Sequence, residues 1–337
     1  MKPHPRLLHR GFTLLELLVA VTITLAISAV MLAAVRATLR QWARAQARQS
    51  ESIAAQQVLD LLGRDFQSAL WRADSGHRLA VDLVDTSAGL ANHGWLFSSG
   101  PMKPSGTASQ KPLPAAGEEN HPLGQLRFGL SGAWLRFVTI NVESGGGLPT
   151  IVSYQVVRRP VIGNPTSANP APVHYALYRS VVSDSETFAK GYDVLATAYE
   201  SASNTPSSAL STAYRQSRNV TNPSHANLLA SNVVDFGCWL YARSPGGELT
   251  RIFPAGPGDA MHHATGDGAT DDTRLPEVAD VFVKILGESG AAVVEALEAG
   301  RLARPLQFST DSEWWWNVVD ENSQVYFRRI EIQGRAP

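Results

Sequence analysis

An apolar run near the N-terminus constrains this chain of 337 residues more than any other feature. It covers residues 12–35, and its polar members are Thr13, Glu16, Thr22, Thr24 and Ser28. As a helix the run would measure roughly 36 Å at 1.5 Å per residue, which exceeds the ~30 Å hydrocarbon core of a bilayer. The run therefore predicts one transmembrane helix and a single-pass protein.

A basic leader without acidic residues precedes the run: residues 1–11 read MKPHPRLLHRG. A basic leader is also typical of a secretory signal peptide, but the apolar core of such a peptide is usually about 7–15 residues long. In addition, Glu16 lies inside the run, and a carboxylate costs on the order of 2.5–3.5 kcal/mol at mid-bilayer and less near the interface. An acid kept at such a cost indicates a function.

The sequence Gly11-Phe12-Thr13-Leu14-Leu15-Glu16 resembles the N-terminal signal of type IV prepilins. The resemblance implies that a membrane peptidase cuts between Gly11 and Phe12. It also implies that the same enzyme methylates the new amino group of Phe12 and that Glu16 serves subunit assembly. This signal covers only the first 40 residues or so. An ordinary signal peptide or a plain membrane anchor is the alternative.

Charges on the two sides of the run do not decide its orientation by the positive-inside rule. Lys2, Arg6 and Arg10 precede the run, and Arg36, Arg40, Arg44 and Arg48 follow it. The resemblance implies a leader in the cytoplasm, a helix in the bacterial inner membrane and a C-terminal domain in the periplasm. The implied filament belongs to the envelope or to the cell surface.

Residues 36–72 are expected to continue the helix beyond the membrane, because they contain no proline and are mostly good helix formers. An amphipathic stripe at spacings of three to four residues is expected along the second half. Its members are Trp42, Gln49, Ile53, Gln57, Leu61, Phe66 and Leu70. The four arginines after the span recur every four residues and face either lipid phosphates or a neighbouring subunit.

Residues 77–337 change to a period of two, which predicts an antiparallel β-rich domain. The expected strands are Leu79–Val84, Gly94–Ser98, Leu126–Leu130, Trp134–Val142, Thr150–Arg158, His174–Val182, Val233–Arg243, Leu249–Phe253, Val278–Leu286 and Gln324–Ile332. Short helices are expected at Ser289–Ala299 and Ser312–Val319. The second contains Trp314–Trp316, which form either core or an exposed contact surface. The fold class is therefore α+β, with a long N-terminal helix packed on the β-rich domain.

Four segments rich in Pro, Gly, Ser or Asn are expected to be loops: residues 100–123, 163–172, 200–226 and 254–274. The last of these contains carboxylates that could ligate calcium through oxygen. The candidates are Asp259, Asp267, Asp271 and Asp272, with His262 and His263 nearby. Their spacing does not match an EF-hand, so we expect a solvated acidic loop without a metal, and a calcium site is the alternative. No cofactor is expected.

Composition and motifs argue against most enzymes and against nucleic-acid binding. The net charge of −1 provides no basic field for a nucleic acid. The single cysteine, Cys238, rules out an intramolecular disulfide and a CxxC metal or redox site, and is expected to be buried. The sequence contains no phosphate-binding GxxxxGK[ST], no HExxH and no GxSxG motif.

The β-rich domain is similar in the order of its elements to minor pseudopilin J of type II secretion. The relevant residues are Leu228-Leu229, the turn at Gly246–Arg251 and the strand opening at Leu275-Pro276-Glu277-Val278. The C-terminal run from Trp314 to Ile332 also resembles a verrucomicrobial pilin-like cassette protein of type C. These resemblances imply a pilin-like fold and a minor pilin or pseudopilin subunit of a type II secretion or type IV pilus-like filament.

The expected partners are inner-membrane lipid, the prepilin peptidase and methyltransferase, and other pilins or pseudopilins. The alternative function is a membrane-anchored periplasmic binding module that uses a prepilin-type signal for delivery. Glu16 favours the first interpretation, because a plain anchor needs no acid within its apolar run.

Overall fold

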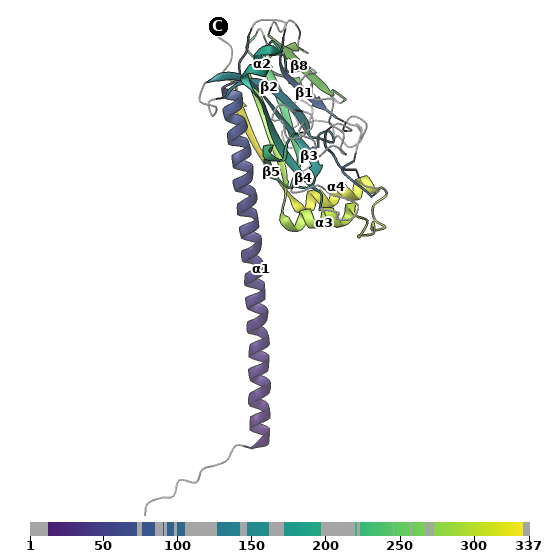
Figure 1. Ribbon diagram of the computed structural model, residues 1–337. Helices are drawn as coiled ribbons and strands as arrows, with labels where there is room; N and C mark the ends of the chain where they lie inside the picture. Colours follow the sequence, from purple (N-terminus) through teal and green to yellow (C-terminus); the bar gives the residue numbers. More distant parts are fainter. Residues whose placement is uncertain are drawn as a thin grey trace, which may run out of the picture. The chain divides into compact units, whose positions relative to one another are not determined.

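The computed structural model describes residues 13–72, 76–84, 90, 93–97, 100–104, 127–141, 147–161, 172–196, 220, 223–244, 246–256, 258–266, 270 and 273–332. The chain divides into two compact units, residues 1–50 and residues 51–337. The helix α1, Leu14–Gln67, contributes to both units and begins and ends close to the expected bounds (Figure 1).

Two antiparallel sheets form most of the second unit. The six-stranded sheet has the order β5-β4-β3-β2-β1-β8, and the four-stranded sheet has the order β10-β9-β6-β7. The strands of the first are β1 His77–Leu83, β2 Ala133–Asn141, β3 Leu148–Arg159, β4 His174–Val182, β5 Leu228–Ser231 and β8 Met261–Thr265. Those of the second are β6 Val233–Arg243, β7 Leu249–Phe253, β9 Val278–Leu286 and β10 Ser323–Glu331. The expectation of a long apolar helix followed by an antiparallel β-rich region is confirmed.

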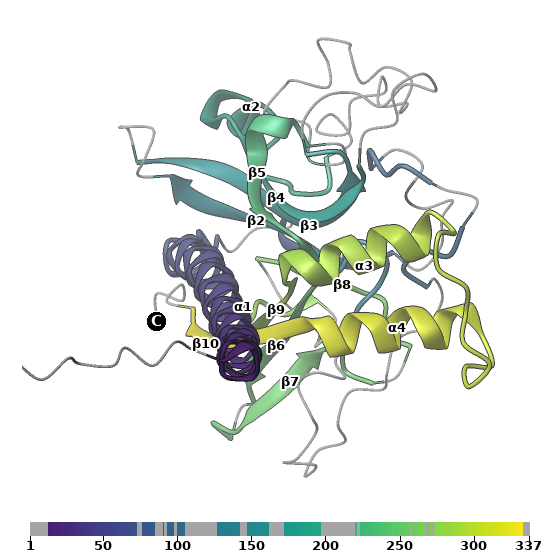
Figure 2. The same cartoon turned by 90° about the horizontal axis from the view of Figure 1, so that it is seen from below.

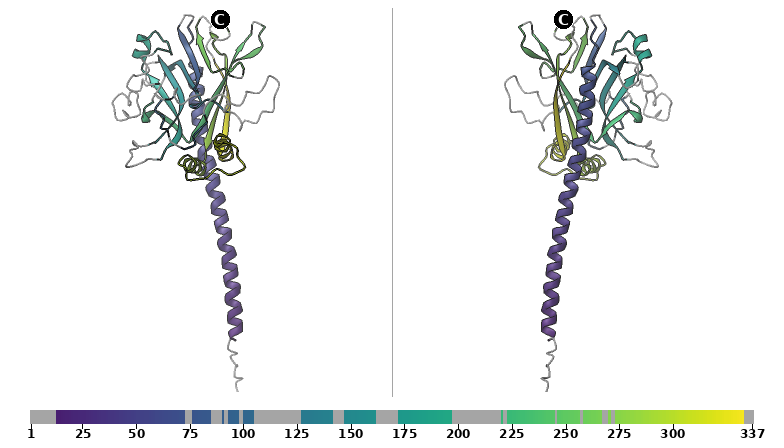
Figure 3. Two further views of the ribbon diagram at one scale, coloured as in Figure 1. Left: turned by 90° about the vertical axis from the view of Figure 1, so that its right-hand side faces the viewer. Right: turned by 90° about the vertical axis from the view of Figure 1, so that its left-hand side faces the viewer.

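The last turns of α1 lie between the two sheets, which Figure 3 shows on either side of them. Phe66 stacks on Phe137 of β2 with ring centroids 4.4 Å apart. The buried face consists of Ala55, Val58, Leu59, Leu62 and Phe66. The expected stripe was therefore wrong by part of a turn, because Ile53 and Gln57 are exposed and only Phe66 of its apolar members is fully buried.

The described residues of this unit also form the α-helices α2 Asp184–Ala189, α3 Glu288–Glu298 and α4 Asp311–Asn322, and the short 3-10 helix η7 His225–Asn227. α3 and α4 lie side by side (Figure 2). The helix α4 begins one residue before the expected Ser312 and is capped by Thr310, whose hydroxyl oxygen accepts the Glu313 N–H at 3.1 Å. Trp314, Trp315 and Trp316 are all buried, so this cluster is core and not an exposed contact surface.

Two expected strands are absent from the residues described. Residues 94–97 and 127–130 have no strand structure, although Trp95, Phe128 and Leu130 are buried in the core. Apolar side chains therefore fill the core here from irregular backbone. Conversely, β8 lies inside the expected loop 254–274, and the short strand β5 and helix α2 were not expected. Cys238 is buried as expected, and burial raises the pKa of its thiol.

Candidate membrane and assembly site

Helix α1 begins with a reciprocal hydrogen-bonded cap between Thr13 and Glu16. The backbone N–H of Thr13 donates to Glu16 Oε2 at 2.9 Å, and the Thr13 hydroxyl donates to the same oxygen at 3.0 Å. In return, the Glu16 N–H donates to Thr13 Oγ1 at 3.3 Å. This is a capping box, which satisfies backbone donors that a helix start leaves unpaired. It directs the Glu16 carboxylate back toward the N-terminal end of the helix.

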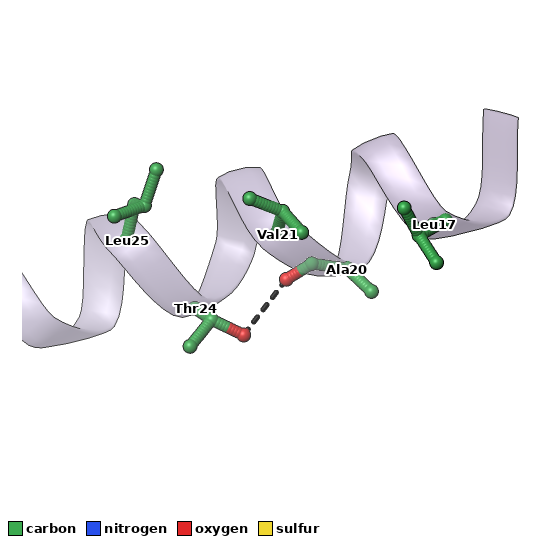
Figure 4. Close-up of a pocket in the computed structure, with 5 residues that line it drawn as sticks. All are labelled: Leu17, Ala20, Val21, Thr24 and Leu25. Atoms are coloured by element: carbon green, nitrogen blue, oxygen red, sulfur yellow. Dashed lines mark hydrogen bonds between the residues drawn. The ribbon is translucent and has the colours of Figure 1, made fainter. Parts of the chain in front are cut away.

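The remaining polar side chains of the apolar run bond to their own helix. The Thr24 hydroxyl donates to the Ala20 carbonyl at 2.8 Å (Figure 4). The Thr22 hydroxyl donates to Val19 O at 2.9 Å, and the Ser28 hydroxyl donates to Thr24 O at 2.8 Å. Since each hydroxyl has an acceptor within the helix, none of them presents an unpaired donor to hydrocarbon.

The surface of this run is apolar on all sides and uncovered within unit 1. A shallow depression along it is lined by Leu17, Ala20, Val21, Thr24 and Leu25 (Figure 4). Among the residues described, α1 is the one helix long and apolar enough to cross a membrane. A helix that is apolar all round is buried in protein or in lipid, so this surface requires a cover that the described residues of unit 1 do not provide.

The basic residues after the apolar run follow one side of α1. Arg36, Arg40 and Arg48 are exposed, while the side chain of Arg44 lies outside the described part of the structure. Gly11 and Phe12, the expected cleavage and methylation residues, also lie outside the described residues.

The candidate calcium ligands are only partly covered by the residues that the structure describes. Asp259 accepts the Ala255 N–H at 2.8 Å, which closes a local turn. His262 and His263 belong to β8, where His262 Nε2 donates to Arg274 O at 2.9 Å and His263 Nε2 lies 2.9 Å from Asp82 Oδ1. No group of three or more ligating side chains that could hold a metal occurs among the described residues. Asp267, Asp271 and Asp272 lie outside them.

Sequence reasoning missed a group of charged side chains around Trp316 in unit 2, which we call the interior lysine cluster; its two lysines and Asp235 are fully enclosed, and its other charged members are partly exposed. Its members are Lys103, Lys284, Arg127, Asp235, Asp320 and Trp316. Lys103 Nζ lies 2.9 Å from Asp235 Oδ1, and Lys284 Nζ lies 2.8 Å from Asp320 Oδ1. All three cations lie over the Trp316 ring, at 5.8, 5.3 and 4.5 Å for Lys103, Lys284 and Arg127.

A second buried network surrounds Glu298 at the end of α3. Tyr175 OH donates to Glu298 Oε1 at 2.6 Å, and Trp315 Nε1 donates to the same oxygen at 2.9 Å. Arg158 Nε donates to Oε2 at 2.7 Å. The Lys103 N–H in turn donates to Tyr175 OH at 3.0 Å, which links this network to the segment that carries the interior lysine cluster.

The signals for these residues differ in strength. The pattern Thr13-x-x-Glu16 is a capping-box signature, so this cap was readable from the sequence. The interior lysine cluster was not, because Lys103 and Asp235 are separated by 132 positions and neither belongs to a motif.

Comparison of the chain with models of known protein families, with curated proteins and with solved structures found no match.

Proposed function

We propose that the chain is a minor pilin or pseudopilin subunit of a type II secretion or type IV pilus-like filament. In this proposal the leader is removed after Gly11, Phe12 becomes the N-methylated first residue, and α1 holds the subunit in the inner membrane. The C-terminal domain then lies in the periplasm. The observation that carries the proposal is the position of Glu16, an acid in the first turn of an otherwise apolar helix.

The direction of the Glu16 side chain supports a role in assembly. Its carboxylate bonds to Thr13, the residue directly after Phe12. Cleavage would create a cationic amine at Phe12, close in depth to this carboxylate. When such helices pack side by side, Glu16 of one subunit can pair with the Phe12 amine of the next. A charge pair in a low-dielectric setting is much stronger than in water, and removal of one partner costs about 3–5 kcal/mol.

A pair of this kind would also set the register between subunits. The apolar surface of α1 offers dispersion contacts at many axial offsets, whereas the two charges meet at one offset only. The uncovered surface described for residues 14–35 gives the neighbouring helices or lipid a place to pack.

The alternative function, a membrane-anchored binding module, is favoured by the same capping box. Thr13 already satisfies the Glu16 carboxylate within one chain, so a lone anchor could keep this acid without any neighbour. The two functions therefore make different demands on Glu16. A filament subunit needs its negative charge, whereas a lone anchor needs only its hydrogen bonds to Thr13.

Two substitutions separate these roles. Glu16→Gln keeps a side chain that can complete the capping box but removes the charge, and Glu16→Ala removes both. Each variant is produced in cells that carry the filament system, and its incorporation is measured by crosslinking to the other subunits. The filament proposal expects both variants to insert into the membrane and both to lose incorporation. Thr13→Ser, which keeps the cap, serves as the matched control and should assemble normally.

Incorporation of Glu16→Gln at the wild-type level would show that the charge is not used and would favour the anchored module. Incorporation of Glu16→Ala at that level would remove any assembly role from this residue. Loss of membrane insertion in the variants would contradict the assignment of α1 as an anchor, because both changes make the run less charged.

A further inference from the structure

The side-chain nitrogen of Lys103 is fully enclosed next to a carboxyl group. The side chains of Lys103 and Asp235 are both 0% exposed, and Nζ lies 2.9 Å from Oδ1. Nζ also donates to the Val234 carbonyl at 3.1 Å. Lys103 belongs to residues 100–104, and Asp235 belongs to β6. The two groups are therefore held together by segments far apart in the chain, without access to water.

The surroundings of the pair favour uncharged forms of both groups. Burial lowers the pKa of Lys103, and the nearby Lys284 lowers it further, while Asp235 acts in the opposite direction. Burial raises the pKa of Asp235 against the opposing effect of the lysines. A neutral amine has the lone pair that a nucleophile needs, and a neutral carboxylic acid has a hydroxyl that can leave as water.

The carboxyl group of Asp235 is also bonded by backbone donors. The Phe128 N–H donates to Oδ2 at 2.9 Å, and the Phe236 N–H donates to Oδ1 at 3.0 Å. Attack at Cγ would place negative charge on Oδ2, where the Phe128 N–H already points. Fixed N–H donors at a developing oxyanion are the usual way in which proteins stabilise acyl transfer.

From this geometry we propose that Lys103 and Asp235 join in an intramolecular isopeptide bond. The Nζ lone pair attacks Cγ, the Nζ–Cγ bond forms, and the Cγ–Oδ1 bond breaks. Nζ gives up one proton, the departing hydroxyl takes it, and one water molecule leaves. No atom changes its oxidation level, and no further reactant is needed. The proposal is independent of the proposed filament function.

The product would keep two of the three hydrogen bonds that join the pair to the backbone, and the third would be lost because the Phe236 N–H donates to the departing Oδ1. The amide N–H would keep the Val234 carbonyl as its acceptor, and the amide oxygen would keep the Phe128 N–H as its donor. No buried polar atom of the new bond would be left unpaired, which is the condition for an amide in a core. Exclusion of water also disfavours hydrolysis, the reverse reaction.

Such a bond would close a covalent loop between positions 132 apart in the chain. The chain has one cysteine and cannot make this connection with an intramolecular disulfide. The cross-link would tie residues 100–104 to β6, an inner strand of the four-stranded sheet. It would thereby reduce the number of conformations open to the unfolded chain, as a disulfide does.

Peptide mass mapping of the full-length protein, purified in detergent, tests the proposal. Trypsin does not cut before proline, and Lys103 and Lys111 are both followed by proline, so it releases residues 79–127 and 219–243. Asp235 has the only side-chain carboxylate in residues 219–243. We expect one branched peptide with the summed mass of both segments less one water molecule, and fragmentation that places the link at Lys103.

Lys103→Arg is the matched variant, because arginine keeps a cation at this position but cannot form the amide. It should release the two segments separately. A ring-closed succinimide at Asp235 would also remove one water, but it would leave residues 79–127 unattached and would persist in Lys103→Arg. Recovery of both wild-type segments at their unmodified masses from folded protein would overturn the proposal and identify the pair as a permanent buried ion pair.

Discussion

Asp65 of α1 and Arg179 of β4 form a two-point ion pair, with Oδ2 2.8 Å from Nε and Oδ1 3.0 Å from NH2. Tyr154 OH donates to the same carboxylate, and Arg179 Nε lies 3.1 Å from the Tyr154 oxygen. The side chains of Asp65 and Arg179 are 10% and 11% exposed. The last turn of α1 is therefore attached to the six-stranded sheet by a paired charge as well as by apolar packing.

Removal of this carboxylate should destabilise the C-terminal unit strongly. Asp65→Ala leaves Arg179 buried without its partner, and loss of one member of a buried pair costs about 3–5 kcal/mol. Asp60 of the same helix offers a matched control, because it pairs with Arg328 but its side chain is 64% exposed. Asp60→Ala should cost about 0–1 kcal/mol. Urea unfolding followed by circular dichroism measures both, and equal losses would contradict the assigned role of Asp65.

His93 should make the unit sensitive to acid. Its Nδ1 lies 2.8 Å from Gln155 Oε1, and its ring packs edge-on against Trp134. Burial lowers the pKa of His93 to about 4 from 6.5. The unfolded chain then binds the proton first, so stability is complete above pH 6.5 and falls as the pH decreases to 4. The loss attributable to this group is about 3 kcal/mol.

The measurement is the free energy of unfolding between pH 7.5 and pH 4 for wild type and His93→Gln. Glutamine does not titrate, so the variant should lose less stability over this interval even though its stability at neutral pH is lower. Parallel pH profiles for the two proteins would show that His93 does not contribute to the acid sensitivity.

Gly132 should tolerate no side chain at the turn before β2. Its φ is +66°, and a Cβ atom built there would lie 2.6 Å from the backbone oxygen of Phe236. Gly247 has a φ of +83° but nothing within 4 Å of the same position. Gly247→Ala therefore measures backbone strain alone, about 1–2 kcal/mol. Gly132→Ala should shift the urea midpoint further, and equal shifts would mean that the turn relaxes freely.

Processing of the leader provides a prediction that depends on the sequence alone. A peptidase that cuts between Gly11 and Phe12 requires a small residue at the cut, so Gly11→Leu should leave the precursor at full mass. Wild type produced together with a prepilin peptidase should lose residues 1–11 and gain one methyl group on Phe12. A mature N-terminus inside residues 26–37 would instead indicate an ordinary signal peptidase.

The strands that the sequence predicted best are those whose runs are apolar or strictly alternating. β4, β6, β7 and β9 have the expected bounds, because each is a short run rich in apolar residues; β9 is buried at every position and β6 at nearly every position. β8 was missed since Met261–Thr265 contains two histidines and sits among Gly and Asp, which mask its pairing with β1. Trp95 and Phe128 misled the prediction in the other direction, because irregular backbone can also supply buried aromatics.

Local chemistry was readable from the sequence, and long-range chemistry was not. Thr13-x-x-Glu16 and Ser183-x-x-Glu186 both match a capping signature, and both start helices. The Asp65–Arg179 and Lys103–Asp235 pairs join residues 114 and 132 positions apart, so only the completed sheet order brings them together. The expected stripe on α1 failed for the same reason, since the sheets that cover the helix determine which of its faces is buried.

The strand β10 has a consequence for the order of events during synthesis. Ser323–Glu331 pairs along its whole length with β9, and Arg328 reaches Asp60 at a separation of 268 positions. Until β10 has left the ribosome, β9 has an unpaired edge and one side of α1 lacks its contact with Arg328. Contacts of such long range form late, and open strand edges invite pairing with other chains. An emerging chain therefore needs protection at least until β10 is available, and a protein without this strand would keep the open edge permanently.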